Sequence, residues 1–301
     1  MHELVVISGK GGTGKTSLTA TFAHLAENAV LCDLDVDAPD LHLIAEPAVQ
    51  RSGPFISGRV AVIDSAACTG CGTCGEVCAY DAIHSEARHF VVETTHCEGC
   101  KVCVVLCPEK AIEFPDRLCG TWYESNTRFG PMVHAQLDPG QENSGKLVTL
   151  LKAKARERAA QLGLELILSD GAPGIGCPVI SSLSQASLVL LVTEPTPSGL
   201  HDLERVAELC RHFRLPSTVL INKADLSPGY QAAIHAFCQT REIPVVGRLP
   251  HDPAVTGAMV RGKAVTEGPD TPFGAQVRQI WWDLRSQLEA PSSSLSKESR
   301  S

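Results

Sequence analysis

The feature that most constrains the fold is a glycine-rich segment near the start of the chain. Residues 3–8 read Glu-Leu-Val-Val-Ile-Ser, which is typical of a buried parallel strand. Residues 9–16 read Gly-Lys-Gly-Gly-Thr-Gly-Lys-Thr and fit the pattern G-x-x-x-x-G-K-[ST]. Glycines let backbone amides approach phosphate oxygens closely, and a following helix presents its positive N-terminus to them. The sequence therefore predicts a strand, a phosphate-binding loop and a helix.

The same pattern gives roles to individual side chains of the loop. Lys15 is expected to reach the β- and γ-phosphates, and Thr16 to place its hydroxyl on Mg²⁺. The residues predicted to bind nucleotide in this stretch are Gly11, Gly12, Thr13, Gly14, Lys15, Thr16 and Ser17.

A second lysine, Lys10, lies inside the loop. With it the loop resembles the deviant Walker A ATPases, the group of MinD, ParA, Mrp-type proteins and the nitrogenase iron protein. The resemblance implies that Lys10 reaches the nucleotide of a partner subunit in an ATP sandwich dimer. That partner is either a second copy or a paralogous ATPase. It also makes Lys10 and Lys15 candidate catalytic residues of a slow, partner-stimulated ATP hydrolysis.

Aspartates follow two further expected strands, where carboxylates can orient a water or support Mg²⁺. One strand ends in Asp33-Leu-Asp35-Val-Asp37. By resemblance to the family's first switch, Asp33 matches the water-orienting position and Asp37 the position near Mg²⁺. Asp170 opens the string Asp-Gly-Ala-Pro-Gly, which resembles the family's Walker B and second switch, so it would hold Mg²⁺ through water. Turn or capping roles are the alternative for Asp33 and Asp37.

Two later segments resemble the family's nucleotide-base site. Asn222 follows an apolar strand, where its amide can read a base edge, and Pro250 and Asp252 resemble a Pro-x-Asp loop that closes over adenine. The string Asn-Lys-Ala-Asp at 222–225 also resembles a guanine-reading motif, whereas the two lysines of the loop indicate ATP.

Cysteines form the second distinctive pattern. Eight of the 13 cysteines lie in two runs with the spacing C-x2-C-x2-C-x3-C, offset by 29 residues (97 − 68). This spacing holds 4Fe–4S clusters, with the fourth cysteine of each run serving the other cluster. Residues 58–116 thus resemble a two-cluster bacterial ferredoxin; two zinc ribbons are the alternative. The predicted ligands are Cys68, Cys71, Cys74 and Cys107 for one cluster, and Cys78, Cys97, Cys100 and Cys103 for the other.

Outside residues 58–116, strands and helices alternate as in a doubly wound, mainly parallel α/β sheet. The expected strands are 3–8, 29–34, 165–170, 187–193, 217–222 and 244–247. The expected helices are 15–27, 144–162, 199–212, 228–240 and 272–289. We therefore predict a P-loop ATPase domain of residues 1–57 and 117–290, an inserted α+β ferredoxin-type domain of residues 58–116, and a disordered tail of residues 291–301.

The composition narrows the classes of molecule that this chain is expected to bind. The chain has 26 basic and 34 acidic residues, a net charge of −8, which argues against nucleic-acid binding. Residues 58–116 carry four basic and nine acidic residues, or −5 of that charge, which suits a basic redox protein partner. No apolar run reaches the roughly 18 residues of a membrane span. No signal peptide is visible, so a cytoplasmic location is expected. Membrane contact by the helix at 272–289 stays open.

These features predict a dimerising Mg²⁺-ATPase that carries two 4Fe–4S clusters and couples ATP state to electron transfer with a protein partner. One alternative is an iron–sulfur cluster carrier, against which no C-x-x-C occurs after Cys107. Another is a positioning ATPase of the MinD or ParA kind. Cys177 lies seven residues after Asp170, where the nitrogenase iron protein has a cluster ligand, so a cluster bridging two subunits also stays open.

Overall fold

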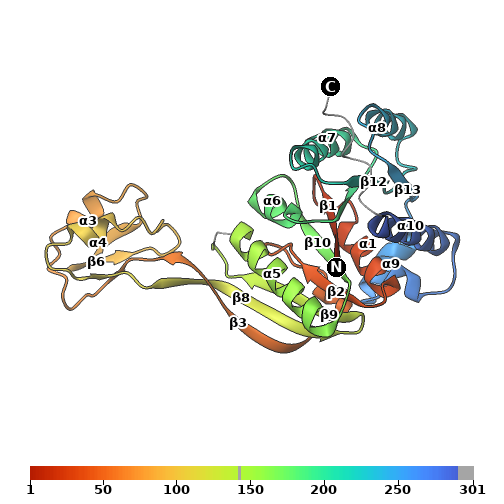
Figure 1. Cartoon of the computed structure of the whole chain (residues 1–301). Coiled ribbons are helices and arrows are strands. Elements are labelled where there is room, and N and C mark those ends of the chain that lie inside the picture. The colour runs from red at the N-terminus through yellow and green to blue at the C-terminus, as the bar shows by residue number, and fades with distance from the viewer. Residues whose placement is uncertain (142–143, 291–301) are drawn as a thin grey trace, which may run out of the picture. The chain divides into compact units, whose positions relative to one another are not determined.

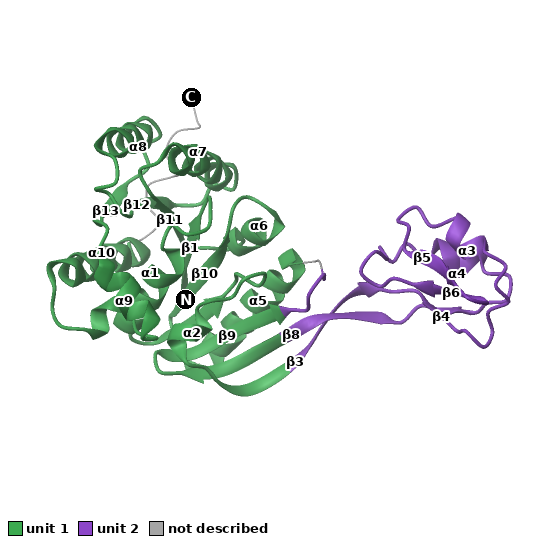
Figure 2. Ribbon diagram, turned by 180° about the vertical axis from the view of Figure 1, so that it is seen from behind, with its two compact units in different colours: residues 1–52, 122–136, 144–301 green, residues 53–121, 137–143 purple. Residues whose placement is uncertain are grey.

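A nine-stranded sheet organises the computed structural model, which describes residues 1–141 and 144–290. The strand order is β13-β12-β11-β1-β10-β2-β9-β8-β3. The described chain divides into two compact units, the first made of residues 1–52, 122–136 and 144–290 (Figure 2). The second unit is made of residues 53–121 and 137–141. The predicted tail, residues 291–301, lies outside the described residues.

The strands of the sheet are β1 (His2–Ser8), β2 (Ala29–Asp33), β3 (Ala48–Arg59), β8 (Asp116–Thr127), β9 (Gly130–Leu137), β10 (Leu166–Pro173), β11 (Leu188–Thr193), β12 (Ser217–Ile221) and β13 (Val245–Arg248). The helices of the first unit are α1 (Lys15–Leu25), α2 (His42–Ala45), α5 (Ser144–Leu162), α6 (Cys177–Leu183), α7 (Pro197–His212), α8 (Pro228–Thr240), α9 (Pro253–Val260) and α10 (Pro272–Glu289), with a 3₁₀ turn, η1 (Val265–Glu267).

The strands that position the site are parallel. β1 pairs with β10 on one side and β11 on the other, and β10 pairs in turn with β2. In this register Val6 lies opposite Asp170, and Asp170 lies opposite Asp33. The carboxyl ends of the central strands therefore meet at one edge of the sheet, where open α/β sheets bind their ligands.

The mainly parallel α/β fold predicted from the sequence is confirmed, and its six expected strands are β1, β2, β10, β11, β12 and β13. Three further strands, β3, β8 and β9, were not expected and extend the sheet beyond β2. Most residues of β3 are exposed, and the strand contains Gly53, Pro54 and Gly58. Such a strand lacks the apolar run or strict alternation by which buried strands are found.

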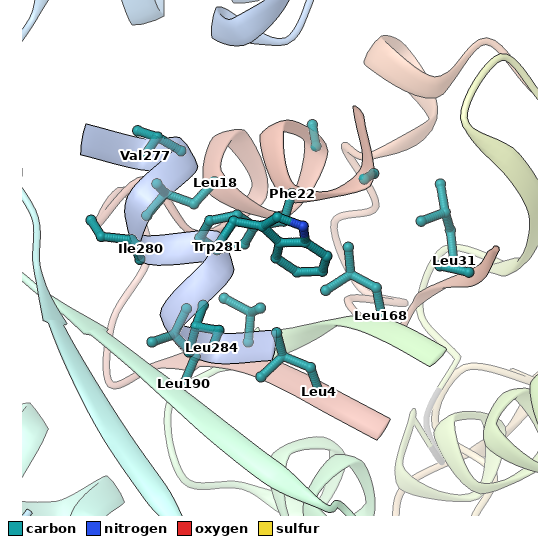
Figure 3. Packing of buried hydrophobic residues seen from close by; sticks show 14 of the residues in the cluster. Leu4, Leu18, Phe22, Leu31, Leu168, Leu190, Val277, Ile280, Trp281 and Leu284 are labelled. Carbon is teal, nitrogen blue, oxygen red and sulfur yellow. The ribbon is translucent and has the colours of Figure 1, made fainter. Parts of the chain in front are cut away.

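Helices cover both faces of the central sheet, and each face has its own hydrophobic core (Figure 1). Leu4 and Val6 of β1 point to the side of α1 and α10, and Val5 and Ile7 to the side of α6, α7 and α8. On the first side the rings of Phe22 and Trp281 stack with their centroids 5.4 Å apart (Figure 3). The last helix thus packs its apolar face against the sheet.

A buried charged network joins α5 to the start of β1. Glu3 is 3% exposed, and its two carboxylate oxygens accept from Lys152 Nζ and from Arg156 Nη2, each at 2.6 Å. Ser169 Oγ of β10 donates to the same carboxylate, and Lys152 also donates to the carbonyl of Ser182 on α6. Burial of these charges is tolerated because each finds a charged or polar partner.

The second unit contains β4 (Val62–Ile63), α3 (Thr73–Glu76), β5 (Ile83–Glu86), β6 (His89–Val92), α4 (Val102–Leu106) and β7 (Ile112–Glu113). β4 pairs antiparallel with β7, and β5 with β6. Its small core holds two pairs of residues at the repeat offset of 29 residues: Cys74 with Cys103, and Ile83 with Ile112. The sequence repeat is therefore also a repeat of buried positions.

Within the described residues, no helix combines the length and apolarity that crossing a membrane requires.

Adjacent tryptophans of α10 give a test of this packing. Trp281 is 2% exposed, whereas Trp282 is 64% exposed. We expect Trp281→Ala to lower the free energy of unfolding by about 3–5 kcal/mol, because it leaves a cavity beside Phe22. Trp282→Ala should change it by no more than about 0.5 kcal/mol. Urea denaturation followed by circular dichroism measures both; equal effects would contradict the assigned packing.

Candidate functional site

The glycine-rich loop connects β1 to α1 in a conformation that few other sequences allow. Gly12 and Gly14 have φ angles of +79° and +90°, in the left-handed region that favours glycine. A Cβ atom on Gly9 would lie 2.4 Å from Asp202 Cβ, so the loop packs directly on α7. These contacts explain the glycines at both ends of the motif.

Around this loop lies a cavity of about 610 Å³. Its volume falls within the range of about 300–1,000 Å³ that is usual for small-molecule sites. Every residue predicted from the sequence to bind nucleotide lines it: Gly11, Gly12, Thr13, Gly14, Lys15, Thr16, Ser17, Asn222, Pro250 and Asp252. Lys10 and Asp37 line it as well, whereas Asp33 and Asp170 do not.

Lys15 is held by buried carboxylates. Its Nζ lies 3.0 Å from Asp170 Oδ1 and 3.6 Å from Asp35 Oδ2, and Thr19 Oγ1 donates to the same Asp170 oxygen at 3.1 Å. Burial works against the charge on Lys15, but Asp170 and Asp35 outweigh it and raise the pKa of Lys15. The lysine is therefore a fixed cation at the base of the cavity.

The second oxygen of Asp170, Oδ2, is buried and has no hydrogen-bond partner among the described residues. A buried carboxylate oxygen without a donor is a group that normally finds a partner. Thr16, the residue after Lys15, also lines the cavity. Oxygen ligands of this kind, together with water, are what Mg²⁺ prefers, so the residues present fit that ion.

The aspartates after β2 are placed differently from one another. Asp33 is 1% exposed, and its carboxylate accepts from the backbone N–H groups of Asp35 and Leu41 at 3.2 and 3.3 Å. Burial, and then the charge of Asp170, raise the pKa of Asp33 well above its ordinary value. Asp35 instead lines the cavity and contacts Lys15. Sequence reasoning did not single out Asp35, although it lies in the same run of alternating aspartates.

Asn222 braces the loop from the end of β12. Its Nδ2 donates to the carbonyl of Thr13 at 2.7 Å, and its Oδ1 accepts from the backbone of Lys223 at 3.0 Å. A Cβ atom on Gly14 would lie 2.4 Å from Nδ2, so glycine is required at that point of the loop. Its amide thus already has a structural task, in addition to lining the cavity.

Part of the cavity lining is apolar and includes Val255, Met259, Val265 and Phe273. Asp252 caps α9, the helix that contains Val255 and Met259, by accepting from the backbone of Ala254 at 2.8 Å. An apolar wall with polar groups at its margin suits a planar ring.

In the second unit, Cys68, Cys71, Cys74 and Cys107 line one small cavity. Three of them come from the first cysteine run and Cys107 from the second. Burial, and then the neighbouring Cys68 and Cys107, raise the pKa of Cys74. Cysteines far apart in sequence are thus brought to one site.

The other four predicted ligands are Cys78, Cys97, Cys100 and Cys103. Burial, and then Cys97 and Cys100, raise the pKa of Cys103, which places these three thiols near each other. Cys78 borders the same small core. The backbone N–H of Ala82 donates to Cys78 Sγ at 3.4 Å, and that of Ala111 donates to Cys107 Sγ at the same distance. The last cysteine of each run therefore has the same local environment.

No three histidine, cysteine or acidic side chains in the described ranges are arranged to hold a single metal ion. A structural zinc site needs thiolates that converge to about 2.3 Å from one ion. Cys68, Cys71, Cys74 and Cys107 instead line a cavity.

Among the five cysteines outside the two runs, Cys32, Cys119, Cys210 and Cys238 are buried. Burial raises the pKa of Cys210 to about 12 and that of Cys238 to about 11, so both are inert thiols. Cys177, at the start of α6, is exposed.

Known proteins resemble this chain in sequence and in fold. An uncharacterized protein of Methanocaldococcus jannaschii, MJ0578, is 34% identical over 228 residues, which cover 75% of this chain and 79% of the relative. The cytosolic Fe-S cluster assembly factor Nubp1 homolog of Drosophila grimshawi is 30% identical over 124 residues, or 34% of this chain and 40% of that protein.

Among solved structures, the septum site-determining protein MinD of Pyrococcus horikoshii, complexed with Mg-ADP, superposes with a TM-score of 0.58. The superposition covers 94% of this chain and 95% of MinD at 15% identity, so it shows a shared fold. Residues 4–265 match the family described as the CobQ/CobB/MinD/ParA nucleotide binding domain. With its phosphate loop, its cavity and its mainly parallel sheet, the chain belongs to this family of P-loop nucleotide-binding proteins.

Proposed function

We propose that this chain is a Mg²⁺-dependent ATPase that dimerises on ATP and carries two 4Fe–4S clusters in its second unit. The nucleotide state would control electron transfer between these clusters and a redox protein partner. The observation that carries the proposal is that cysteines from both halves of the repeat line one cavity in a chain with a complete P-loop site.

The ATPase part rests on the charges at the base of the cavity. Lys15 would neutralise the β- and γ-phosphates, and Mg²⁺ would be held by Thr16 and, through water, by Asp170, with Asp37 nearby. The ion would supply further neutralisation of the charge that develops in phosphoryl transfer. Because Asp35 lines the cavity and Asp33 does not, we propose Asp35 as the residue that orients the attacking water.

The redox part rests on the cysteine environments. We propose that residues 58–116 form a ferredoxin-type module, with Cys68, Cys71, Cys74 and Cys107 on one cluster and Cys78, Cys97, Cys100 and Cys103 on the other. Its net charge of −5, counted from the sequence, favours a basic partner. Because such clusters need reduced thiols, we propose a cytoplasmic location. The dimer partner would be a second copy or a paralogous ATPase.

An iron–sulfur cluster carrier is the second candidate, and the likeness to the Nubp1 homolog favours it. Anaerobic measurements separate the two. If ATP shifts the reduction potential of clusters that stay bound, the electron-transfer function is supported. If the potential is unchanged and ATP instead drives cluster transfer to an apo-ferredoxin, the carrier function is correct.

Asp35→Asn should lower the ATP hydrolysis rate by about 100-fold or more, because the group that orients the water is lost. Nucleotide affinity should change little, since the backbone of the loop and the Lys15–Asp170 pair are kept. Asp33→Asn is the matched comparison and should chiefly reduce stability. Phosphate release and binding of a fluorescent ATP analogue measure the two effects. If Asp33→Asn alone abolished hydrolysis in a stable protein, Asp33 would be the water-orienting residue after all.

The proposed clusters are not equivalent, because the repeat differs beside one thiol. Thr73 Oγ1 lies 3.5 Å from Cys71 Sγ, and the residue at the matching place beside Cys100 is Val102. A hydroxyl that donates to a cluster thiolate stabilises the added electron and raises the reduction potential.

Anaerobically purified protein should contain about eight iron atoms per chain and show two separate reduction steps. Thr73→Val should lower the higher potential, and Val102→Thr should raise the lower one. Redox titrations followed by electron paramagnetic resonance measure both. Iron content far below this value rejects the clusters, whereas an unchanged pair of potentials in both variants rejects only the role of the hydroxyl.

A further inference from the structure

The loop lysine Lys10 is fully engaged by its own chain. Its Nζ lies 2.6 Å from Glu194 Oε1, 3.0 Å from Ser198 Oγ and 3.4 Å from Thr196 Oγ1. A lysine ammonium has three donors, and three acceptors surround this one. The ammonium that the family resemblance assigns to a partner's nucleotide is thus bound by acceptors of its own chain.

The acceptors are held rigidly between β11 and α7. Glu194 directly follows β11, and Thr196 caps α7 by accepting from the backbone of Gly199 at 3.0 Å. A Cβ atom on Gly199 would lie 2.1 Å from the carbonyl oxygen of Glu194, so the backbone here is tightly packed. The binding place for the Lys10 ammonium is therefore preformed.

Glu194 serves two lysines at once. Its Oε2 lies 3.0 Å from Lys223 Nζ, and Lys223 Nζ also donates to the carbonyl of Gly12 at 3.0 Å. The Glu194 side chain is only 11% exposed. Burial opposes its ionisation, but hydrogen bonds and charges from Lys10 and Lys223 prevail and lower the pKa of Glu194. The carboxylate is thus a fixed anion at neutral pH.

We propose that Glu194 is a positioning residue that holds Lys10 in the free subunit and thereby sets the threshold for ATP-dependent dimerisation. This inference rests on the proposed ATP sandwich dimer. The nucleotide phosphates of a second subunit and the carboxylate of Glu194 compete for the same ammonium, so dimerisation requires Lys10 to leave Glu194.

Lys223 makes the contact between Lys10 and Glu194 reversible. Lys223 stays on Glu194 when Lys10 leaves, so the largely buried carboxylate keeps one cation. Each subunit of a symmetric dimer must release one Lys10. A roughly twofold preference for the held state leaves Lys10 released in about a third of the subunits, so the requirement on both subunits weakens dimerisation by about tenfold.

The test compares Glu194→Gln with Asp202→Asn in the full-length protein. Asp202 also lies near the loop, beside Gly9, but its side chain contacts His201 Nδ1 at 3.2 Å, so this control removes the same charge without touching Lys10. Sedimentation velocity with a slowly hydrolysed ATP analogue at saturating concentration gives the dimer dissociation constant. Acylation of lysines followed by mass spectrometry, without nucleotide, gives the reactivity of Lys10.

We expect Glu194→Gln to lower the dimer dissociation constant by about tenfold and to increase Lys10 labelling, with Asp202→Asn resembling the wild type. Dimerisation that is unchanged or weaker in Glu194→Gln, while the wild type dimerises, overturns the role of Glu194. If neither protein dimerises with the analogue, the sandwich dimer of the proposed function is wrong, and with it the threshold. In that case, higher Lys10 labelling in Glu194→Gln than in the wild type would still show that Glu194 holds Lys10. Only the link to dimerisation would then be rejected.

Discussion

The buried pair between Lys15 and Asp170 is the interaction on which the first unit depends. It joins the first residue of α1 to β10, and the two side chains are 7% and 0% exposed. An isolated charge in such a place would cost several kcal/mol, so the pair is stable only if both members are present and further partners satisfy them. Asp35 and Thr19 supply these partners. The register of β1, β10 and β2 must therefore hold within a residue, because a slip would move Asp170 away from the loop.

The second unit differs from the first in the size of its core. Its described core is small, and two of the five buried residues in it are Cys74 and Cys103. Small domains that bury little apolar surface commonly need a metal or a disulfide for stability. In the proposed cluster-bearing form, the clusters would therefore be part of the core as well as carriers of electrons.

Much of this arrangement could be predicted from the sequence, because it depends on local patterns. The apolar runs of β1, β10 and β11 are buried on both faces, and the glycine motif requires one conformation. The exposed, glycine-containing β3 carries no such pattern, and its pairing with β8 depends on distant residues.

The roles of the carboxylates after β2 were harder to predict for the same reason. Whether Asp33 or Asp35 faces the cavity is decided by the backbone of Leu41, eight residues away from Asp33, which captures one carboxylate. Likewise, the contact of Lys10 with Glu194 joins residues 184 positions apart, and a motif does not reveal it. The motifs could be recognised in the sequence, whereas the choice between Asp33 and Asp35 depended on contacts that only the folded structure shows.

The network around Glu3 limits how the segment after Asp170 can rearrange. Lys152, 3% exposed, is bound both by Glu3 at the base of β1 and by the carbonyl of Ser182 in α6. Moving α6 as a body would take away one of the two acceptors of a buried cation, so this contact anchors the helix. Gly174, with a φ of +93°, lies between Asp170 and that anchored helix. A conformational change at the cavity is thus confined to the few residues between Asp170 and α6, because α6 itself is held in place.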